Sequence, residues 1–280
     1  MRAASLPASP AFWVALVFAA LVLRMEALGP ILRLGFPGAA PVVYDRASFL
    51  SLLLSQAGLV AAASLGAAVV GVGLAIFVTR PSGREFRAMV TALATVGQTF
   101  PPAAILAIAV PIVGFGAAPT VIALFLYGLL PIVENAVAGL EGVPPGVREA
   151  AEGMGLSPTQ LLLEVELPLA APLILAGIRV SVTIAIGTAT IGATVGALTL
   201  GTPILDGLVT NNIPFIIEGA VLAALFAILT DLLLAFLIWD GWPSSAGWAI
   251  GLLVGINMVF VGVSLIMTAL AARKMAPHSG

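Results

Sequence analysis

The chain has 280 residues, of which 61% are hydrophobic and only 9% are charged, and its mean hydropathy is +1.18. Soluble globular proteins are about half apolar and about a quarter charged, so this composition excludes an ordinary soluble domain. A net charge of −2 does not favour a nucleic-acid partner, and the absence of cysteine excludes disulfides, iron–sulfur clusters and thiolate zinc sites.

Two residue types that often carry chemistry are almost missing. The single histidine, His278, lies at the end of the chain, so the hydrophobic body has no histidine for metal binding or proton transfer. The single lysine, Lys274, follows Arg273, so no Gly-Lys pair exists to form a phosphate-binding loop. We therefore expect no catalytic residue, no metal and no cofactor in this chain, and any ATP that drives it must bind to another subunit.

Apolar windows recur along the chain, each long enough to cross ~30 Å of hydrocarbon as a helix of about 20 residues. They predict an all-α polytopic membrane protein. The first span is expected at 12–28, where Arg24 and Glu26 make a poor cleavage site and favour an uncleaved span over a secretory signal peptide. Residues 29–47 are predicted to be an extramembrane loop.

The other spans are predicted from the same pattern. A short helix broken at Pro101-Pro102 precedes the third span, and a loop at 199–213 separates the fifth span from the sixth. The spans are a second at 55–79, a third ending near Val113, a fourth at 120–133, a fifth from Pro168 and a sixth at 214–238.

Basic residues predict the orientation, because cytoplasmic loops are enriched in arginine and lysine. With the N-terminus inside, the cytoplasmic side holds Arg2, Arg80, Arg84, Arg87 and Arg148, and the outer side holds only Arg33 and Arg46. The sequence therefore predicts a cytoplasmic N-terminus and a cytoplasmic loop between the fourth and fifth spans.

That loop contains EAAEGMGLSPTQLLLEVELP, residues 149–168, with four of the thirteen acidic residues. Pro144-Pro145 can begin a helix, Gly155 can end it, and Ser157 with Gln160 forms a capping-box pattern that begins a second helix. The sequence predicts two short helices around a glycine turn. Spacing alone leaves open whether they are a solvated surface or a docking surface.

The loop resembles the EAA loop of permease subunits in binding-protein-dependent ABC importers. In that family Glu-Ala-Ala is followed by three residues and Gly, then by nine residues and Ile, then by one residue and Leu-Pro. Here Val165 stands in the isoleucine position, and the other positions are matched by Glu149, Ala150, Ala151, Gly155, Leu167 and Pro168. The resemblance implies a five-helix type I permease core at 51–238 whose loop, 141–168, couples to an ATPase.

Within the family, the segments VGQTFPP, LFLYGLLPIVENAVAGL and GIRVSVTIAIGTATIGA are most similar to the osmoprotectant branch, which imports glycine betaine, carnitine or choline. The resemblance implies a bacterial inner-membrane protein with ABC ATPase subunits, an extracytoplasmic substrate-binding protein and a second permease copy or paralogue as partners. A permease for amino acids or another small solute is the alternative. A secondary transporter is disfavoured because we find neither an internal repeat nor a cluster of intramembrane carboxylates.

Polar and small residues interrupt the fifth span, and two interpretations of their role remain open. They are Thr183, Thr188, Thr190, Thr194 and a G-x-x-x-G pair formed by Gly192 and Gly196. One reading is close helix packing with hydroxyls bonded to the backbone. The other, implied by the resemblance, is a gate or pathway lining.

Arg179 lies within the fifth span and is expected to face the bundle interior beside an acidic partner. Glu134 and Asp231, each in the cytoplasmic half of its span, are the candidates. An intramembrane ion pair and a substrate site are both compatible with this pattern, and the ion pair is favoured.

The predicted organisation has three parts: an N-terminal span with its external loop at 1–50, the permease domain at 51–238 and an extra hydrophobic segment at 239–280. The last part contains 246–272, long enough for a seventh span and similar to HdeD-like acid-resistance membrane proteins. A seventh span would leave Arg273 and Lys274 outside, against the positive-inside trend. We assign it no function.

Overall fold

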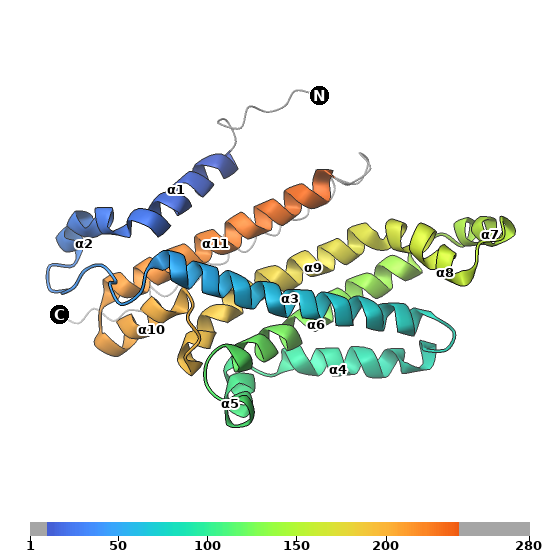
Figure 1. The fold of residues 1–280 in the computed structure, drawn as a ribbon, viewed down its shortest axis with the longest axis horizontal. Helices are drawn as coiled ribbons and strands as arrows, with labels where there is room; N and C mark the ends of the chain where they lie inside the picture. The colour runs from blue at the N-terminus through green and yellow to red at the C-terminus, as the bar shows by residue number, and fades with distance from the viewer. Residues whose placement is uncertain (1–9, 241–280) are drawn as a thin grey trace, which may run out of the picture. The chain divides into compact units, whose positions relative to one another are not determined.

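The structure is a computed structural model that describes residues 10–240, and the hydrophobic run 246–272 lies outside the described residues. Every regular element in the described range is a helix (Figure 1). Helices long and apolar enough to cross a membrane are Phe12–Gly35, Phe49–Thr79, Ala117–Glu141, Pro158–Val195 and Ile213–Phe236. A bent helix pair adds up to one further span.

The N-terminal span is longer than predicted. Helix α1, Pro10–Arg24, continues through a 3-10 turn into α2, Gly29–Gly35. Pro30 occupies the first turn of α2, where the missing N–H of a proline does no harm, so it does not end the helix. The prediction of a loop from residue 29 is therefore wrong for its first seven positions, and the loop runs from Phe36 to Ser48.

Helix α3, Phe49–Thr79, begins before the predicted residue 55. Its start is set by Ser48, whose Oγ accepts a hydrogen bond from the Ser51 N–H at 3.2 Å, a normal N-cap. Its end agrees with the prediction, since Arg80 is extended in front of Pro81.

The predicted third span is not one straight helix. Helices α4, Arg87–Thr99, and α5, Pro102–Val113, meet at 96°. Each is about 18–20 Å long at ~1.5 Å per residue, too short to cross a membrane alone. The bend follows from Pro101-Pro102, because the residue before a proline avoids helical angles, and Phe100 is extended.

Helix α6, Ala117–Glu141, continues two turns beyond the predicted end at residue 133. Pro131 lies inside it and has no N–H to give to the carbonyl of Tyr127, one turn earlier. Gln98 on α4 supplies the missing donor, with its Nε2 at 2.9 Å from that carbonyl oxygen. The proline therefore creates the acceptor that attaches α4 to α6.

The fifth span begins earlier than Pro168. Helix α8, Pro158–Gln160, passes through a π-helical turn, Leu161–Glu166, into α9, Leu167–Ala189, and ends in a 3-10 helix, Thr190–Val195. The Leu167 N–H bonds to the Leu162 carbonyl, five residues back. This wide turn lets one continuous helix pass Pro168.

Helix α10, Gly201–Thr210, occupies most of the region predicted as a loop at 199–213, and α11, Ile213–Asp240, follows. Asn211, with φ +54°, ends α10, and asparagine is one of the few non-glycine residues that adopt this left-handed conformation readily. α10 is too short to span the membrane.

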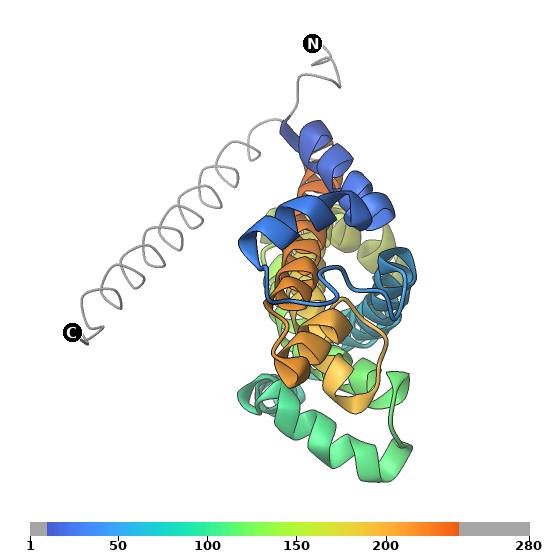
Figure 2. The same cartoon turned by 90° about the vertical axis from the view of Figure 1, so that its left-hand side faces the viewer.

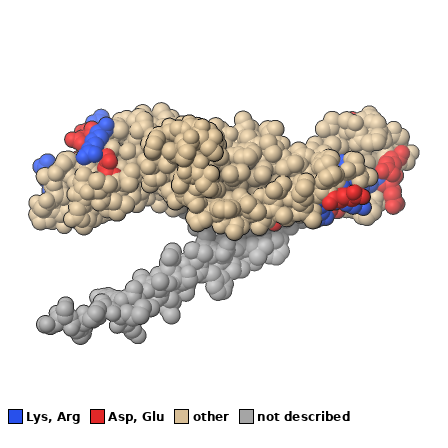
Figure 3. All heavy atoms as spheres, turned by 90° about the horizontal axis from the view of Figure 1, so that it is seen from below, with Lys and Arg blue, Asp and Glu red and all other residues tan. Residues whose placement is uncertain are grey.

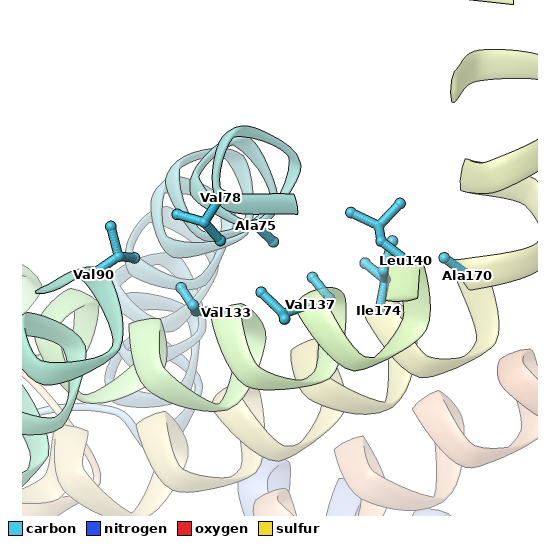
Figure 4. Packing of buried hydrophobic residues seen from close by; sticks show 9 residues of the cluster. Ala75, Val78, Val90, Val133, Val137, Leu140, Ala170 and Ile174 are labelled. Atoms are coloured by element: carbon cyan, nitrogen blue, oxygen red, sulfur yellow. The ribbon is translucent and has the colours of Figure 1, made fainter. Parts of the chain in front are cut away.

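Helix α6 lies in the middle of the bundle and contacts α3, α4, α5 and α9. Figures 1 and 2 show α1 and α2 on one side of the α3, α6 and α9 group, with α4 and α5 on the opposite side. At the end that leads into α7, Pro145–Gly153, these helices bury Ala75, Val78, Val90, Val133, Ala136, Val137, Leu140, Ala170 and Ile174 (Figure 4). Small residues permit this closeness: a Cβ on Gly177 would lie 2.7 Å from the Pro131 carbonyl oxygen.

Gln56 on α3 joins three elements near the other end. Its side chain is fully buried, its Nε2 donates to the Ile186 carbonyl at 3.0 Å, and its Oε1 accepts from the Leu200 N–H at 2.8 Å. Both backbone partners lie where regular helix changes, just before the 3-10 segment and just before α10. One amide therefore satisfies two buried backbone groups.

Replacing Gln56 by Leu is expected to destabilise the protein by about 2 kcal/mol, because both buried backbone groups lose their partner. Thermal unfolding of the purified permease in detergent measures this loss. Ser55→Ala, at the neighbouring position, is the control and should unfold like the wild type. Equal unfolding of the Gln56 variant and the control would contradict the prediction.

Candidate functional site

On the face that Figure 3 shows, most charged residues gather at two separate ends of the described helices, with mainly uncharged surface between them. At one end Arg80 and Arg148 contact Glu166, and Arg87 contacts Glu141. At the other end Arg46 pairs with Asp206 at 3.1 Å. The contacts thus place three of the arginines predicted for one side of the membrane at one end.

The segment between α6 and α9 forms a hairpin of two short helices, α7, Pro145–Gly153, and α8. We call residues 145–160 the α7–α8 hairpin. Gly155 has φ +85° and follows the C-cap of α7. Its N–H bonds to the Glu152 carbonyl at 2.9 Å, and the Leu156 N–H bonds to the Ala151 carbonyl at 3.2 Å. These two bonds make a Schellman motif, so the predicted glycine turn is present.

The second helix of the hairpin begins as predicted at a capping box. The Ser157 Oγ accepts the Gln160 N–H at 3.4 Å, and the Gln160 Oε1 accepts the Ser157 N–H at 3.0 Å. Local sequence therefore fixes both ends of the turn without help from the membrane helices.

The outward face of α7 is apolar although it lies at the charged end. Val147, Ala150 and Met154 are exposed, Met154 to 75%, while Ala151 is buried. Positions i, i+3 and i+7 form one stripe on a helix, the pattern that a partner's groove binds. Glu149, Glu152 and Gly155 are exposed beside this stripe, Leu167 is half-buried and Pro168 is exposed.

Glu166 holds the hairpin to the membrane helices, although it is not among the residues predicted from the sequence. Its side chain is only 3% exposed and contacts the guanidinium groups of Arg80, directly after α3, and Arg148 on α7, the latter at 3.0 Å. Arg148 also donates to the carbonyl of Leu140 in the last turn of α6. One signal was available: Glu166 precedes the buried residues Ala170 and Ile174 at four-residue intervals, on one helix face.

Arg179 and Asp231 form a bidentate ion pair between α9 and α11. The Arg179 Nε and Nη2 lie 2.7 Å from the two carboxylate oxygens. The Thr183 hydroxyl bonds to the Arg179 carbonyl at 3.0 Å and lies 3.4 Å from the Asp231 carboxylate. Glu134, the other candidate partner, is on α6, exposed, and has no hydrogen-bond or ion-pair partner within residues 10–240.

The remaining threonines lie on α9 and the 3-10 segment. Thr190 and Thr194 donate to the carbonyls of residues three positions earlier, Gly187 and Ile191, each at 2.7 Å. Thr188 is half-buried beside them. Such bonds satisfy hydroxyls within one helix, as the packing interpretation requires.

The two glycines of the G-x-x-x-G pair have different surroundings. A Cβ on Gly192 would lie 2.6 Å from the Thr120 side chain, so this glycine permits close contact with α6. Gly196, with φ +84°, ends the 3-10 helix. They do not form one packing face within the described chain. Among those residues no group of His, Asp or Glu could hold a metal ion.

The end opposite the hairpin is held together around Tyr44. Its backbone N–H donates to Glu218 on α11 at 2.9 Å, and its hydroxyl donates to Asp206 on α10 at 3.0 Å. The Asn212 Nδ2 donates to the Pro41 carbonyl at 2.8 Å. The loop at 36–48 is therefore attached to both α10 and α11.

Tyr44 predicts an alkaline limit to stability. Burial first, and then the hydrogen bond and negative charge of Asp206, raise the pKa of Tyr44 to about 12. The usual value is about 10, so the folded state holds this proton more tightly. The stabilisation of the folded state by this raised pKa is complete below about pH 10. It is lost towards pH 12, where the free energy of unfolding falls by about 1.4 kcal/mol per pH unit. Tyr44→Phe should lack this component when denaturant unfolding is followed from pH 8 to 12, and an identical alkaline slope would contradict it.

Long apolar helices, charges gathered mostly at two ends and a patterned hairpin at one end indicate a polytopic membrane protein. Residues 71–240 match the family model described as binding-protein-dependent transport system inner membrane component. The chain belongs to this family.

Named relatives are osmoprotectant permeases. The osmoprotectant import permease protein OsmY of Salmonella typhimurium is 44% identical over 170 residues, covering 61% of this chain and 72% of the relative. The glycine betaine/carnitine/choline transport system permease protein OpuCD of Bacillus subtilis is 40% identical over 174 residues, covering 62% and 75%.

Solved structures with the same fold are ABC transporters. The inward-facing MetNI methionine ABC transporter gives a TM-score of 0.62 at 19% identity, covering 69% of this chain and 96% of that chain. An amino acid ABC transporter with histidines gives 0.55 at 18% identity, covering 78% and 95%. At this identity the likeness concerns the fold alone.

Proposed function

We infer that this chain is the permease subunit of an ATP-driven ABC importer for osmoprotectants such as glycine betaine, choline or carnitine. The α7–α8 hairpin is the observation that carries the proposal, because its apolar stripe is a docking surface and not a catalytic arrangement. The names of the relatives support the substrate class. The chain itself performs no covalent chemistry, and a separate subunit hydrolyses ATP.

The hairpin is the surface that contacts the ATPase. Val147, Ala150 and Met154 enter a groove on that subunit, and Glu149 contacts basic or amide groups at its edge. Because the ATPase works in the cytoplasm, this end of the chain and its N-terminus are cytoplasmic. The excess of arginine at the same end supports this orientation.

The opposite end meets the substrate-binding protein. The loop at 36–48 and helix α10 are held rigidly by Tyr44, Asp206 and Asn212, which makes them a preformed surface. A second permease copy or a paralogue completes a dimer. The family match at 71–240 supports a permease domain at 51–238, preceded by a separate part at 1–50 and followed by one at 239–280.

Reconstitution tests the function directly. The permease is co-expressed with its ATPase, placed in proteoliposomes with the binding protein outside, and supplied with ATP inside. ATP-dependent uptake of labelled choline or glycine betaine is expected, with methionine as the control solute. Uptake of methionine without either osmoprotectant, or a permease that does not co-purify with any ATPase, would overturn the proposal.

A further inference from the structure

Glu134 is an unpaired carboxylate inside a membrane helix. It lies seven residues before the end of α6, about 10 Å along the helix axis at ~1.5 Å per residue. Its side chain is exposed, and no described residue pairs with it, whereas Asp231 pairs with Arg179 and Glu218 accepts from Tyr44. Glu26 and Glu164 are also exposed in the candidate spans without a partner among the described residues, but Glu26 lies in the turn between α1 and α2 and Glu164 lies beside the hairpin, whereas Glu134 lies on the central helix α6.

Three sides of α6 around this position are covered. Ile132 meets α3 at Gly71, Pro131 and Asn135 meet α9 at Gly177, and Val133 packs with Val90 of α4. Figure 4 shows Val133 and Val137 among the residues of this core. Glu134 follows Val133 by about 100° around the helix and falls on the remaining side, between α4 and α9.

The uncovered side is a continuous stripe. Glu134, Ala138 and Glu141 are all exposed, spaced four and three residues apart. Glu141 is paired with Arg87 at the charged end, but Glu134 lies too deep for its short side chain to reach that end. A charged group facing lipid at this depth costs several kcal/mol, so this stripe faces water or protein and not hydrocarbon.

We propose that the face of α6 carrying Glu134 and Ala138 lines a water-filled path for the substrate, in the half of the membrane nearer the hairpin, where the Glu134 carboxylate attracts a quaternary ammonium group. The proposal rests on the proposed function for the identity of the cargo. Its geometric part does not, since the exposure and depth of Glu134 require a polar environment whatever passes. A carboxylate compensates a cation that has lost part of its hydration shell, and it does so least for a zwitterion.

The first test asks whether the stripe faces water. The chain has no cysteine, so single cysteines can be introduced without altering the background. Glu134→Cys and Ala138→Cys are treated, in the assembled complex, with a trimethylammonium-bearing methanethiosulfonate reagent that reacts with hydrated thiolates. Both should be modified, at least about fivefold more slowly with excess choline. Leu65→Cys on α3, 69% exposed on an apolar surface, is the lipid-facing control and should not react.

Two results of the cysteine test would contradict the proposal. If Glu85→Cys, at an exposed position before α4, is modified but neither stripe position is, the stripe does not face water and the proposal is overturned. Modification of both positions that choline does not slow would overturn the substrate contact.

The second test measures the role of the charge. Glu134→Gln should lower the maximal rate of choline uptake about tenfold and that of glycine betaine, whose own carboxylate cancels its charge, only about two- to threefold. The choline concentration for half-maximal uptake should stay the same, because the binding protein sets it. Glu134→Asp should recover most of the choline rate.

Controls separate this inference from the proposed function. Glu85→Gln, an exposed acid in the loop before α4, should transport like the wild type. If the wild type takes up neither osmoprotectant, the proposed function fails and the cysteine test alone decides the geometry. If the wild type transports both and Glu134→Gln slows them equally or not at all, the inference fails.

Discussion

Replacing Gly155 by Asp is expected to leave the permease in the membrane but to lower ATP-dependent osmoprotectant uptake at least about tenfold. Gly155 has φ +85°, a conformation that costs a residue with a Cβ about 1–2 kcal/mol. A Cβ there would meet no atom within 4 Å, so the change strains the backbone and adds a charge to the docking surface without a clash. Uptake by proteoliposomes and co-purification of the ATPase are the measurements.

Gly146→Asp is the matched control, because it adds the same side chain to the first turn of the same helix, also in open space and at an ordinary φ. An acid at a helix N-terminus is favourable, so this variant should lose less uptake than Gly155→Asp, and the difference measures the contribution of the turn. Normal uptake by the Gly155 variant would show that neither the turn nor its charge matters for coupling.

Replacing Glu166 by Gln is expected to have the largest effect on stability, about 3 kcal/mol. Removing one member of a buried ion pair costs roughly 3–5 kcal/mol, and the low end applies because Arg80 and Arg148 keep about a third of their side chains exposed. The loss should lower the unfolding temperature in detergent by about 5 °C or more. It should also expose the junction before α9 to limited proteolysis.

Glu164→Gln, two residues earlier on the exposed side of the same helix, is the control. It removes the same charge without touching either arginine. If the two variants unfold at the same temperature and are cleaved at the same rate, the three-residue cluster does not hold the hairpin in place.

The hairpin could be predicted from sequence because its determinants are local. Gly155 ends one helix and Ser157 with Gln160 begins the next, and the bonds that result connect residues only a few positions apart. Spans were found for the same reason, since the membrane requires each one to be apolar along its whole length. Their ends were less accurate, as at Ser48 and Pro168, where a cap and a wide turn extend the helix.

Features that depend on distant contacts were missed. Glu166 is 86 positions from Arg80, and no residue near Glu166 in the sequence indicates that the two side chains are in contact. The choice of Asp231 over Glu134 as the partner of Arg179 depends on how α6 and α11 are rotated, which apolar composition does not encode. The break between α4 and α5 was visible as Pro101-Pro102, but its 96° angle is set by packing against α6.

The continuous helical path from Pro158 to Val195 connects the hairpin to the opposite end of the bundle. Its 38 residues form a rod on the order of 55 Å long, which begins beside the hairpin turn and ends where Val195 accepts a hydrogen bond from Gly116. A tilt of about 5° at the hairpin end would displace the far tip by about 5 Å, on simple leverage over that length. If the path moves as one body, a protein that presses on the far tip would in the same way tilt the hairpin. A movement of the hairpin at one face of the membrane would therefore displace the end of the same helix at the other face, with no other component crossing the membrane.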